Sequence, residues 1–262
     1  MKLESNGITI NCEVSGPESA PVVALSHSLA SSSMMWAAQV PALEQHFRVV
    51  QLDTRGHGGS DAPAMAYSLD MLGDDLLAAL DALGVEKFHW VGLSMGGMIG
   101  QNLALRAPER IGKLVLCDTS ARTTPEAVPV WDERIAQART EGMSAIAEST
   151  LARWFTPPYL EKRPPVVETI RRQIVATPVD GYIGCCEALK TLDYLDRLPG
   201  VALPALVVVG EEDLGTDVAT ARTMHDAISG SRLAILPSAA HLSNVEQAEA
   251  FNECVLDFLL SE

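Results

Sequence analysis

The sequence predicts an α/β fold in which a mostly parallel central sheet is flanked by helices and carries an inserted helical cap. Short apolar runs alternate with helical segments up to residue 118 and again from residue 204, which is typical of a parallel sheet covered on both faces. Residues 122–203 lack a comparable apolar run and are helical and rich in turns. We therefore expect residues 1–121 and 204–262 to form one core, with residues 122–203 inserted as a cap.

Length, charge and cysteine content limit the classes to which the chain can belong. Its 262 residues, 47% of them hydrophobic, suffice for one large core. The net charge of −15 argues against nucleic acid and anionic membranes as partners, because both are negatively charged. We find neither the pattern of a signal peptide nor an apolar stretch long enough to span a membrane. The five cysteines, without the spacing of a metal site or disulfide framework, fit a reducing cytoplasm, and the oligomeric state stays open.

The core elements follow one another in a regular order. Residues 1–14 alternate between apolar and polar side chains, which is typical of an antiparallel hairpin at a sheet edge. A continuous apolar run predicts a strand buried on both faces at residues 21–26. Buried strands are also expected at residues 90–93 and 110–118, and further strands at residues 47–53, 204–210 and 233–237. Helical patterns predict helices at residues 34–43, 68–83, 95–104, 218–228 and 244–260.

A glycine-rich turn at residues 54–61 follows the second apolar run. It lacks the spacing of a phosphate-binding loop, and no helix begins directly from it. We interpret it as structural, with Asp53 and Arg55 holding the loop in place. His27, in the loop after the first run, is interpreted in the same way, as a hydrogen-bonding residue that braces its loop.

The cap segment has two interpretations. Helices are expected around residues 131–141, 143–155, 166–176 and 182–192, and the proline pairs at 157–158 and 164–165 divide them. The segment either adds packing or forms a lid that shapes a pocket and excludes water. We favour the lid, which would lie over Ser94.

Ser94 forms a G-x-S-x-G pattern with Gly92 and Gly96 where a strand gives way to a helix. This pattern is typical of a nucleophile elbow, whose sharp turn lifts the serine hydroxyl clear of the sheet. Glycine fits the flanking positions because side chains there would collide with the neighbouring strand and helix. The first helix amides point at the same space and favour developing negative charge. The alternative is a glycine-rich junction with a capping serine, and the choice depends on partner residues elsewhere.

Asp213 and His241 supply such partners, because each follows the end of a predicted strand. A neutral His241 would take the proton of Ser94 as its hydroxyl attacks a carbonyl carbon. Asp213 would hold the imidazole tautomer and stabilise its cation, and water would then hydrolyse the acyl-enzyme. The chain order serine, acid, histidine therefore predicts a serine hydrolase.

Competing residues occur near both partners. The other histidines follow no motif-bearing strand end or lie in the glycine-rich turn: His46, His57, His89 and His225. Glu211 and Glu212 adjoin Asp213 and are interpreted as solvated loop carboxylates. Asp213 is preferred because it lies three residues after Gly210 and because a short side chain suits a tight loop.

The chain resembles the α/β-hydrolase superfamily along nearly its whole length. The segments that carry this resemblance are residues 26–29, 53–58, 91–97, 210–213 and the region around His241. More narrowly, the chain resembles the 3-oxoadipate enol-lactonases of bacterial aromatic degradation, in residues 26–29, 153–157 and 181–189. The last two segments lie in the predicted cap, where substrate choice usually resides. One departure is Ser28, which follows His27 where many superfamily members have glycine.

This resemblance implies a reaction and a set of contacts. The backbone amides of Leu29 and Met95 would form the oxyanion hole. The substrate would be an unsaturated five-membered lactone with an acetate arm, hydrolysed to 3-oxoadipate without a metal or an organic cofactor. Because that lactone is an anion and the chain is acidic, binding needs a local cation. Arg153 is our first choice, and Arg122 and Arg134 are competitors.

Aromatic residues of the cap are further candidates for substrate contact. Trp154, beside Arg153, would form an apolar wall around the ring with Phe155, and Trp131 is a second tryptophan in the same segment. Other functions on this fold stay open: a broad carboxylesterase, a cofactor-free perhydrolase or a non-hydrolytic ligand-binding member. Serine instead of aspartate at position 94 argues against a haloalkane dehalogenase.

Overall fold

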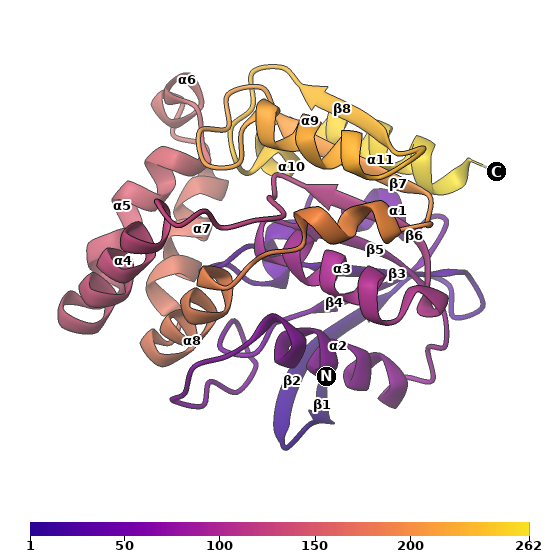
Figure 1. Cartoon of the computed structure of the whole chain (residues 1–262), viewed down its shortest axis with the longest axis horizontal. Helices are drawn as coiled ribbons and strands as arrows, with labels where there is room; N and C mark the ends of the chain where they lie inside the picture. Colours follow the sequence, from indigo (N-terminus) through magenta and orange to yellow (C-terminus); the bar gives the residue numbers. More distant parts are fainter. Residues whose placement is uncertain (262) are drawn as a thin grey trace.

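The computed structural model describes residues 1–261, and its centre is an eight-stranded sheet with the order β1-β2-β4-β3-β5-β6-β7-β8 (Figure 1). β1 (Lys2–Ser5) and β2 (Ile8–Ser15) pair antiparallel, and β2 pairs antiparallel with β4 (Arg48–Leu52). From β4 onward all pairs are parallel and join β3 (Val22–Ser26), β5 (Phe88–Leu93), β6 (Ile111–Cys117), β7 (Ala205–Gly210) and β8 (Arg232–Leu236). The predicted α/β fold with a mostly parallel sheet is thus confirmed.

The strand order reverses beside β3, and this reversal positions the site. The chain passes from β3 to β4 on one side and then to β5 on the other, with Ser26 of β3 level with Gly92 of β5. In open parallel sheets, ligands bind at the carboxyl ends of the strands where such a reversal occurs. The loop that begins at His27 and the turn at Ser94 therefore meet at the same edge.

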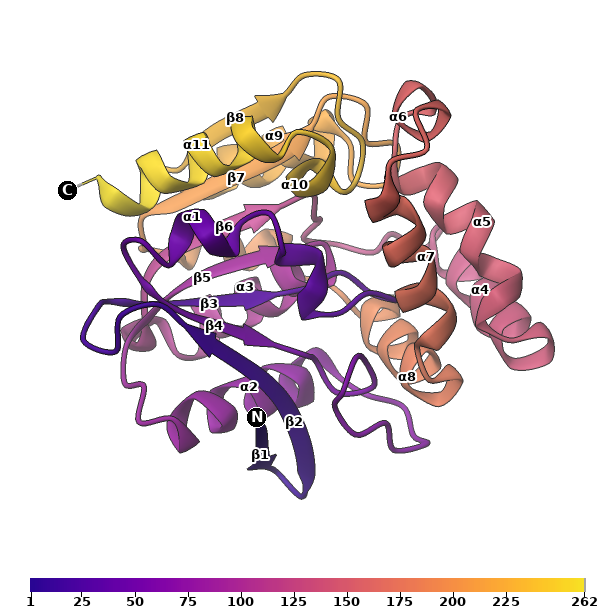
Figure 2. The same ribbon diagram turned by 180° about the vertical axis from the view of Figure 1, so that it is seen from behind.

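Helices cover both faces of the sheet. α2 (Leu69–Ala82), α3 (Met95–Arg106) and α9 (Val218–Ala227) lie on the face turned to the viewer in Figure 1, with α3 against β5 and β6 and α9 against β7. The short α1 (Val40–Leu43) and the C-terminal α11 (Ala248–Leu260) cover the opposite face, which Figure 2 turns to the front. This covering leaves the strand ends as the accessible part of the sheet.

Two expected helices are interrupted. Residues 34–43 form a 3-10 turn (Ser33–Trp36) and a separate α1, which begins beside Pro41 because proline suits a first helical turn but cannot continue a helix. Residues 244–260 form α10 (Ser243–Glu246) and α11, which are separated at Gln247 by a non-helical backbone with φ −124° and ψ 53°. The strand expected at residues 110–118 is shorter and follows a 3-10 turn at Pro108–Arg110.

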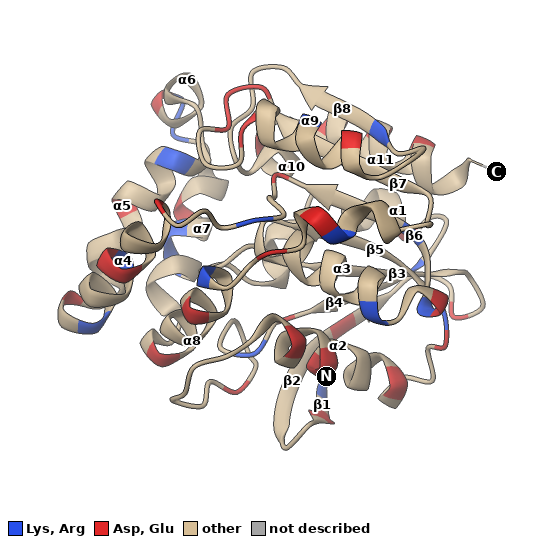
Figure 3. Ribbon diagram, viewed as in Figure 1, with Lys and Arg blue, Asp and Glu red and all other residues tan. Residues whose placement is uncertain are grey.

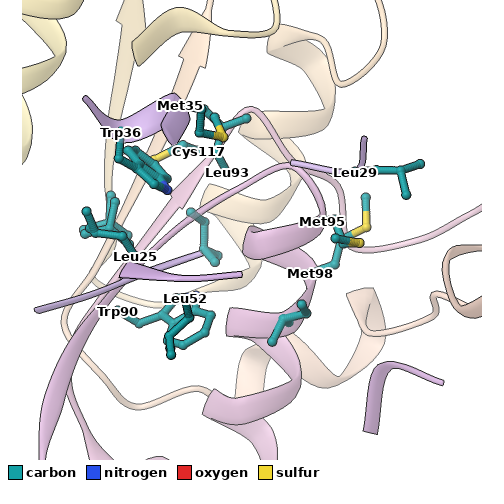
Figure 4. Close-up of a cluster of buried hydrophobic side chains, with 14 of the residues drawn as sticks. Leu25, Leu29, Met35, Trp36, Leu52, Trp90, Leu93, Met95, Met98 and Cys117 are labelled. Atoms are coloured by element: carbon teal, nitrogen blue, oxygen red, sulfur yellow. The ribbon is translucent and has the colours of Figure 1, made fainter. Parts of the chain in front are cut away.

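A buried apolar cluster supports the edge that carries the site (Figure 4). Its fully buried members include Leu25, Trp36, Leu52, Trp90 and Leu93. The indole N–H of Trp90 donates to the carbonyl oxygen of Gly96 at 3.0 Å, so the one polar atom of this side chain is satisfied. This hydrogen bond connects the turn at Ser94 to the closely packed core beneath it.

The glycine-rich turn after β4 is held by the two residues expected to hold it. Asp53 accepts hydrogen bonds from the backbone N–H groups of Ser33 at 2.7 Å and Gly59 at 2.8 Å. Arg55 forms a buried two-point ion pair with Asp75 of α2, at 2.6 and 2.9 Å. The structural interpretation of this turn is therefore confirmed.

Most of residues 122–203 form a group of helices beyond one end of the sheet (Figures 1 and 2). They are α4 (Val128–Glu141), α5 (Met143–Trp154), α6 (Pro157–Glu161), α7 (Pro165–Ala176) and α8 (Val179–Lys190). The 3-10 turn at Leu195–Gly200 lies apart from this group, against α3 and α9 of the core. The four expected helices are confirmed with small shifts at their ends. α6 was not predicted: it begins at the prolines 157–158, which divide two longer helices but also suit the first positions of a helix. No helix within residues 1–261 is long and apolar enough to cross a membrane.

Candidate active site

Ser94 occupies the turn between β5 and α3 with φ 56° and ψ −114°, a backbone conformation that is costly for a residue with a side chain. Close packing explains the flanking glycines. A Cβ atom at Gly92 would lie 2.1 Å from the carbonyl oxygen of Gly96, and one at Gly96 would lie 2.2 Å from that of Ser26. The structure therefore has the strand–turn–helix geometry that the G-x-S-x-G pattern predicts.

Ser94 lines a cavity of about 380 Å³ at the carboxyl ends of the strands. Its lining includes, from the core, Leu29, Met98, Asp213, Thr216 and His241. From the helices of residues 122–203 it includes Trp131, Arg134, Arg153, Trp154 and Tyr182. The structure thus brings the three expected catalytic residues into one cavity with all three cap residues expected to contact the substrate.

Asp213 and His241 form a hydrogen-bonded pair. The carboxylate Oδ2 lies 2.8 Å from His241 Nδ1, and the same oxygen accepts from the hydroxyl of Thr216 at 2.7 Å. The other oxygen, Oδ1, accepts from the N–H groups of Gly215 at 2.8 Å and Thr216 at 3.1 Å. Asp213 is 2% exposed, so this set of donors holds a buried carboxylate in a single orientation.

The competing residues lie outside the cavity. Glu211 and Glu212 are exposed, in agreement with their interpretation as solvated carboxylates. The other histidines do not belong to the cavity lining: His46, His57, His89 and His225.

The charges of Asp213 and His241 shift each other's titration. Burial alone would raise the pKa of Asp213, but His241 and the hydrogen bonds from Thr216 lower it below its ordinary range. Burial alone would lower the pKa of His241, but the Asp213 carboxylate raises it above its ordinary range. Both shifts favour a carboxylate beside an imidazolium, which is the pair that forms when His241 accepts a proton.

A second buried acid, Asp118, follows β6 and was not among the sequence candidates. Its Oδ1 accepts from the N–H of Gly210 at 2.8 Å, and its Oδ2 lies 2.5 Å from the hydroxyl of Ser243. Burial and the charge of Asp213 raise the pKa of Asp118 to about 8, so this group carries a proton at neutral pH. Asp118 therefore ties three loops together without adding a negative charge beside Asp213.

The two amides expected to form an oxyanion hole lie on neighbouring segments. Leu29 belongs to the loop after β3 and lines the cavity. Met95 is the first residue of α3, and its N–H has no acceptor within the helix. The N–H of Gly96 donates to the carbonyl oxygen of His27 at 3.1 Å, which fastens the two segments to each other.

The end of α5 lies against the loop that carries His241. The ring of Trp154 stacks on the imidazole of His241, with 6.4 Å between ring centroids and an interplanar angle of 28°. The carbonyl oxygen of Trp154 accepts from the N–H of Leu242 at 3.0 Å. Residue 154 is thus connected to the histidine loop through both its side chain and its backbone.

Glu246 of α10 strengthens this connection, although no sequence pattern pointed to it. Its carboxylate accepts from the N–H of Thr156 at 3.2 Å, from the Thr156 hydroxyl, and from the N–H of Ala240 at 3.1 Å. One side chain therefore holds the residues that follow α5 and the residue before His241 together.

Three arginines line the cavity, but they differ in their partners. Arg122 lies 2.6 Å from Asp193 and 2.5 Å from Asp196, so carboxylates of the chain already offset its charge. Arg134 and Arg153 form no ion pair with any of residues 1–261. Of the three arginines named from the sequence, the first choice Arg153 and the competitor Arg134 thus remain without a carboxylate partner among residues 1–261.

Arg134 and Arg153 give the cavity a cationic side. The guanidinium carbon of Arg134 lies 4.8 Å from the ring centroid of Trp131, a cation–π distance. Arg153 donates to the hydroxyl of Thr150 at 3.2 Å. Burial and the charge of Arg134 lower the pKa of Arg153. A cavity with two such cations suits an anionic ligand.

Comparison with known proteins agrees with this geometry. Residues 21–248 match the family described as the alpha/beta hydrolase fold. The chain is 35% identical to 3-oxoadipate enol-lactonase 2 of Acinetobacter baylyi, over 97% of this chain and 94% of that protein.

Two solved structures have closely similar folds. The enol-lactonase from Burkholderia xenovorans LB400 has a TM-score of 0.96 and 42% identity, with both chains fully covered. A thermophilic esterase from Thermogutta terrifontis has a TM-score of 0.93 and 30% identity, over 99% of this chain and 97% of that chain. The chain therefore belongs to the α/β-hydrolase family and is a carboxylic ester hydrolase.

Proposed function

We propose that the protein hydrolyses 3-oxoadipate enol-lactone to 3-oxoadipate, with Ser94 as nucleophile, His241 as general base and Asp213 as the supporting acid. One observation carries this proposal. The hydrogen-bonded Asp213–His241 pair and Ser94 share a cavity with Arg134 and Arg153, which form no ion pair within residues 1–261. The names of the enol-lactonases from Acinetobacter baylyi and Burkholderia xenovorans support the choice of substrate.

The first half of the reaction opens the lactone ring. His241 takes the hydroxyl proton of Ser94 as Oγ forms a bond to the lactone carbonyl carbon. The carbonyl oxygen becomes an oxyanion, which the N–H groups of Leu29 and Met95 stabilise. When the intermediate collapses, the bond from the carbonyl carbon to the ring oxygen breaks. The ring oxygen leaves as an enolate that takes the proton from the His241 imidazolium, and the resulting enol tautomerises to a ketone. The acyl group stays on Ser94, and His241 is neutral again.

The second half releases the product. A water molecule gives a proton to His241 and bonds to the acyl carbon, which produces a second tetrahedral intermediate in the same oxyanion hole. Its collapse breaks the bond to Ser94 Oγ, which recovers its proton from His241. The product has two carboxylates where the lactone had one, and the free enzyme is restored.

The acetate carboxylate of the lactone would bind to the cationic side of the cavity. Arg153 stays our first choice because its neighbour Trp154 stacks on His241, so a carboxylate at Arg153 lies close to the reacting groups. Arg134 is the second candidate. It lies on α4, whereas Arg153 lies on α5, and both side chains line the cavity. A planar guanidinium can hold a carboxylate through two parallel hydrogen bonds.

The overall charge makes such a local cation necessary. The chain has 34 acidic and 19 Lys and Arg residues, and the acidic residues occur both on the core helices and on the helices of residues 122–203 (Figure 3). Their combined field repels an anion, so the substrate must gain its affinity from contacts within the cavity.

The test is a comparison of substrates. We expect the purified protein to hydrolyse the enol-lactone with a kcat/KM at least about 100-fold above that for p-nitrophenyl acetate, because only the lactone engages the arginines. Equal values for the two substrates would favour a general carboxylesterase, and the Thermogutta terrifontis relative is named an esterase. Hydrolysis of the neutral ester alone would exclude the lactonase assignment and leave the ester-hydrolase chemistry intact.

A further inference from the structure

Two buried histidines outside the triad, His27 and His57, enclose the loop that follows β3. Neither has exposed surface, and their ring centroids lie 5.3 Å apart. Neither lines the cavity, and the reaction described above does not use them. Both nevertheless form hydrogen bonds with backbone atoms on either side of Leu29, and these bonds define what the two rings do.

His27 holds the peptide group that precedes Leu29. Its Nε2 lies 2.9 Å from the N–H of Thr54, and because a backbone N–H can only donate, Nε2 is the nitrogen without a proton. The ring proton is therefore on Nδ1, which donates to the carbonyl oxygen of Ser28 at 2.8 Å. The N–H of Ser31 also reaches this oxygen, at the longer distance of 3.2 Å.

The bond to Ser28 determines the direction of the Leu29 N–H. The carbonyl of Ser28 and the N–H of Leu29 belong to one planar trans peptide group, in which they point in opposite directions. A donor that holds the oxygen on one side therefore aims the N–H to the other. His27 acts in this way on the amide that we assign to the oxyanion hole.

His57 holds the peptide group that follows Leu29. Its Nε2 accepts from the N–H of Ala30 at 2.9 Å, so its proton is on Nδ1, which lies 3.3 Å from the carbonyl oxygen of Arg55. With His27 on one side and His57 on the other, both peptide planes that define the backbone angles of Leu29 are held.

The loop needs such support because it is strained. Ala30 has φ 60°, in the left-handed region that residues other than glycine rarely adopt. Rotation of the peptide between Leu29 and Ala30 would relieve this strain, since it changes the φ of Ala30. The bond from the Ala30 N–H to His57 opposes that rotation.

Both rings must be neutral to hold these bonds. Burial lowers the pKa of His27, and burial together with His27 lowers the pKa of His57 to about 3. Each ring therefore offers one donor and one acceptor throughout the physiological pH range.

We propose that His27 and His57 are positioning residues that fix the peptide planes on either side of Leu29 and so aim its N–H at the substrate carbonyl oxygen. This inference rests on the proposed function, because it assigns both residues a task in the same oxyanion hole. The rings do not touch the substrate, and their effect on the reaction passes through the backbone of Leu29.

Paired substitutions at each position separate this task from simple packing. The side-chain amide of asparagine reaches the place of a histidine Nδ1, and that of glutamine reaches the place of Nε2. At position 27 the bond to Ser28 involves Nδ1, so His27→Asn keeps it and His27→Gln loses it. At position 57 the bond to Ala30 involves Nε2, so His57→Gln keeps it and His57→Asn loses it. The better substitute therefore differs between the two positions.

The experiment measures kcat and KM for p-nitrophenyl acetate and the Kd of phenylboronic acid, which forms a tetrahedral adduct with a nucleophilic serine. Loss of one oxyanion donor typically lowers the rate by about 10²–10³, and a misaligned donor retains part of its effect. We therefore expect His27→Gln and His57→Asn to lose at least about tenfold in kcat, with KM nearly unchanged, and to bind the boronic acid correspondingly more weakly. His27→Asn and His57→Gln should each lose less than their counterpart.

Thermal unfolding of the four variants provides the control. The inference is overturned if the same residue, asparagine or glutamine, retains the higher kcat at both positions. It is also overturned if the loss in kcat of each variant is proportional to the fall in its thermal unfolding midpoint. A wild-type protein that hydrolyses no ester would instead overturn the proposed function. If the wild type is active but asparagine is not the better substitute at position 27 and glutamine at position 57, this inference alone would be overturned.

Discussion

At the scale of single residues, burial distinguishes the acid of the site from its neighbours. Three consecutive acidic residues follow β7, but only Asp213 is buried, at 2% exposure, and bonded to His241. Glu211 and Glu212 are exposed. Chain order and spacing predicted this assignment, and the geometry provides its physical reason.

Asp213→Asn should lower kcat by about 10³–10⁴, because an amide at this position favours the wrong tautomer of His241. Steady-state hydrolysis of the enol-lactone measures the loss. Glu211→Gln and Glu212→Gln are the matched controls, and each should change kcat by less than about twofold. A loss at either glutamate equal to that at Asp213 would move the supporting acid to that residue.

The raised pKa of His241 predicts the pH dependence of the reaction. Only the neutral imidazole can accept the proton of Ser94, so kcat/KM falls as pH decreases through the pKa of His241. Because Asp213 raises that pKa, the midpoint of the acid limb should lie above about 6.5, the value of a free histidine side chain. A profile of kcat/KM against pH with a neutral ester avoids titration of the substrate. A midpoint below 6.5 would contradict the pairing of these two residues.

At the scale of elements, the sequence predicted the sheet well and the connections less well. Runs rich in apolar residues marked the parallel strands, because strands inside such a sheet are buried on both faces. The edge strand β8 is only half-buried. α6 was missed, since proline both divides and begins helices. Asp118 and Glu246 were not predicted because each bonds to a backbone amide far along the chain, Gly210 at a separation of 92 residues and Thr156 at 90. No local pattern reports such bonds.

Glu246 couples two elements, and its removal should affect both activity and stability. Glu246→Ala leaves the N–H groups of Thr156 and Ala240 without their acceptor, at a cost of about 1–3 kcal/mol in the free energy of unfolding. Because Trp154 and His241 lie on the two connected segments, kcat should fall by about tenfold. Denaturant unfolding and kcat are measured together. The exposed Glu249, on the next helix, is the control, and equal effects of Glu249→Ala would show that loss of a negative charge alone is responsible.

At the scale of the whole molecule, the proposed function requires an acidic protein to bind an anionic substrate, and the cationic side of the cavity would resolve this conflict. Arg153→Ala should lower kcat/KM for the enol-lactone by about 10–100-fold, the usual cost of a hydrogen-bonded charge, and change it little for p-nitrophenyl acetate. Arg134→Ala tests the second candidate in the same way.

Arg139→Ala is the control for overall charge. Arg139 is exposed on the same helix as Arg134 but does not line the cavity, so the substitution removes one positive charge outside the cavity. It should leave both substrates nearly unaffected. Equal losses on the lactone and the neutral ester in Arg153→Ala would indicate damage to the cavity wall in place of a lost carboxylate contact.

The most direct test of the account is hydrolysis of the enol-lactone by Ser94→Ala beside the wild type. Ser94 sits at the strained turn and lines the same cavity as the hydrogen-bonded Asp213–His241 pair, and the proposed reaction depends on its hydroxyl. We expect rapid hydrolysis by the wild type and less than about one-hundredth of that rate by Ser94→Ala, with an unchanged unfolding midpoint. A folded Ser94→Ala protein that retains more than this activity, or a wild type that leaves the lactone intact, would contradict the account.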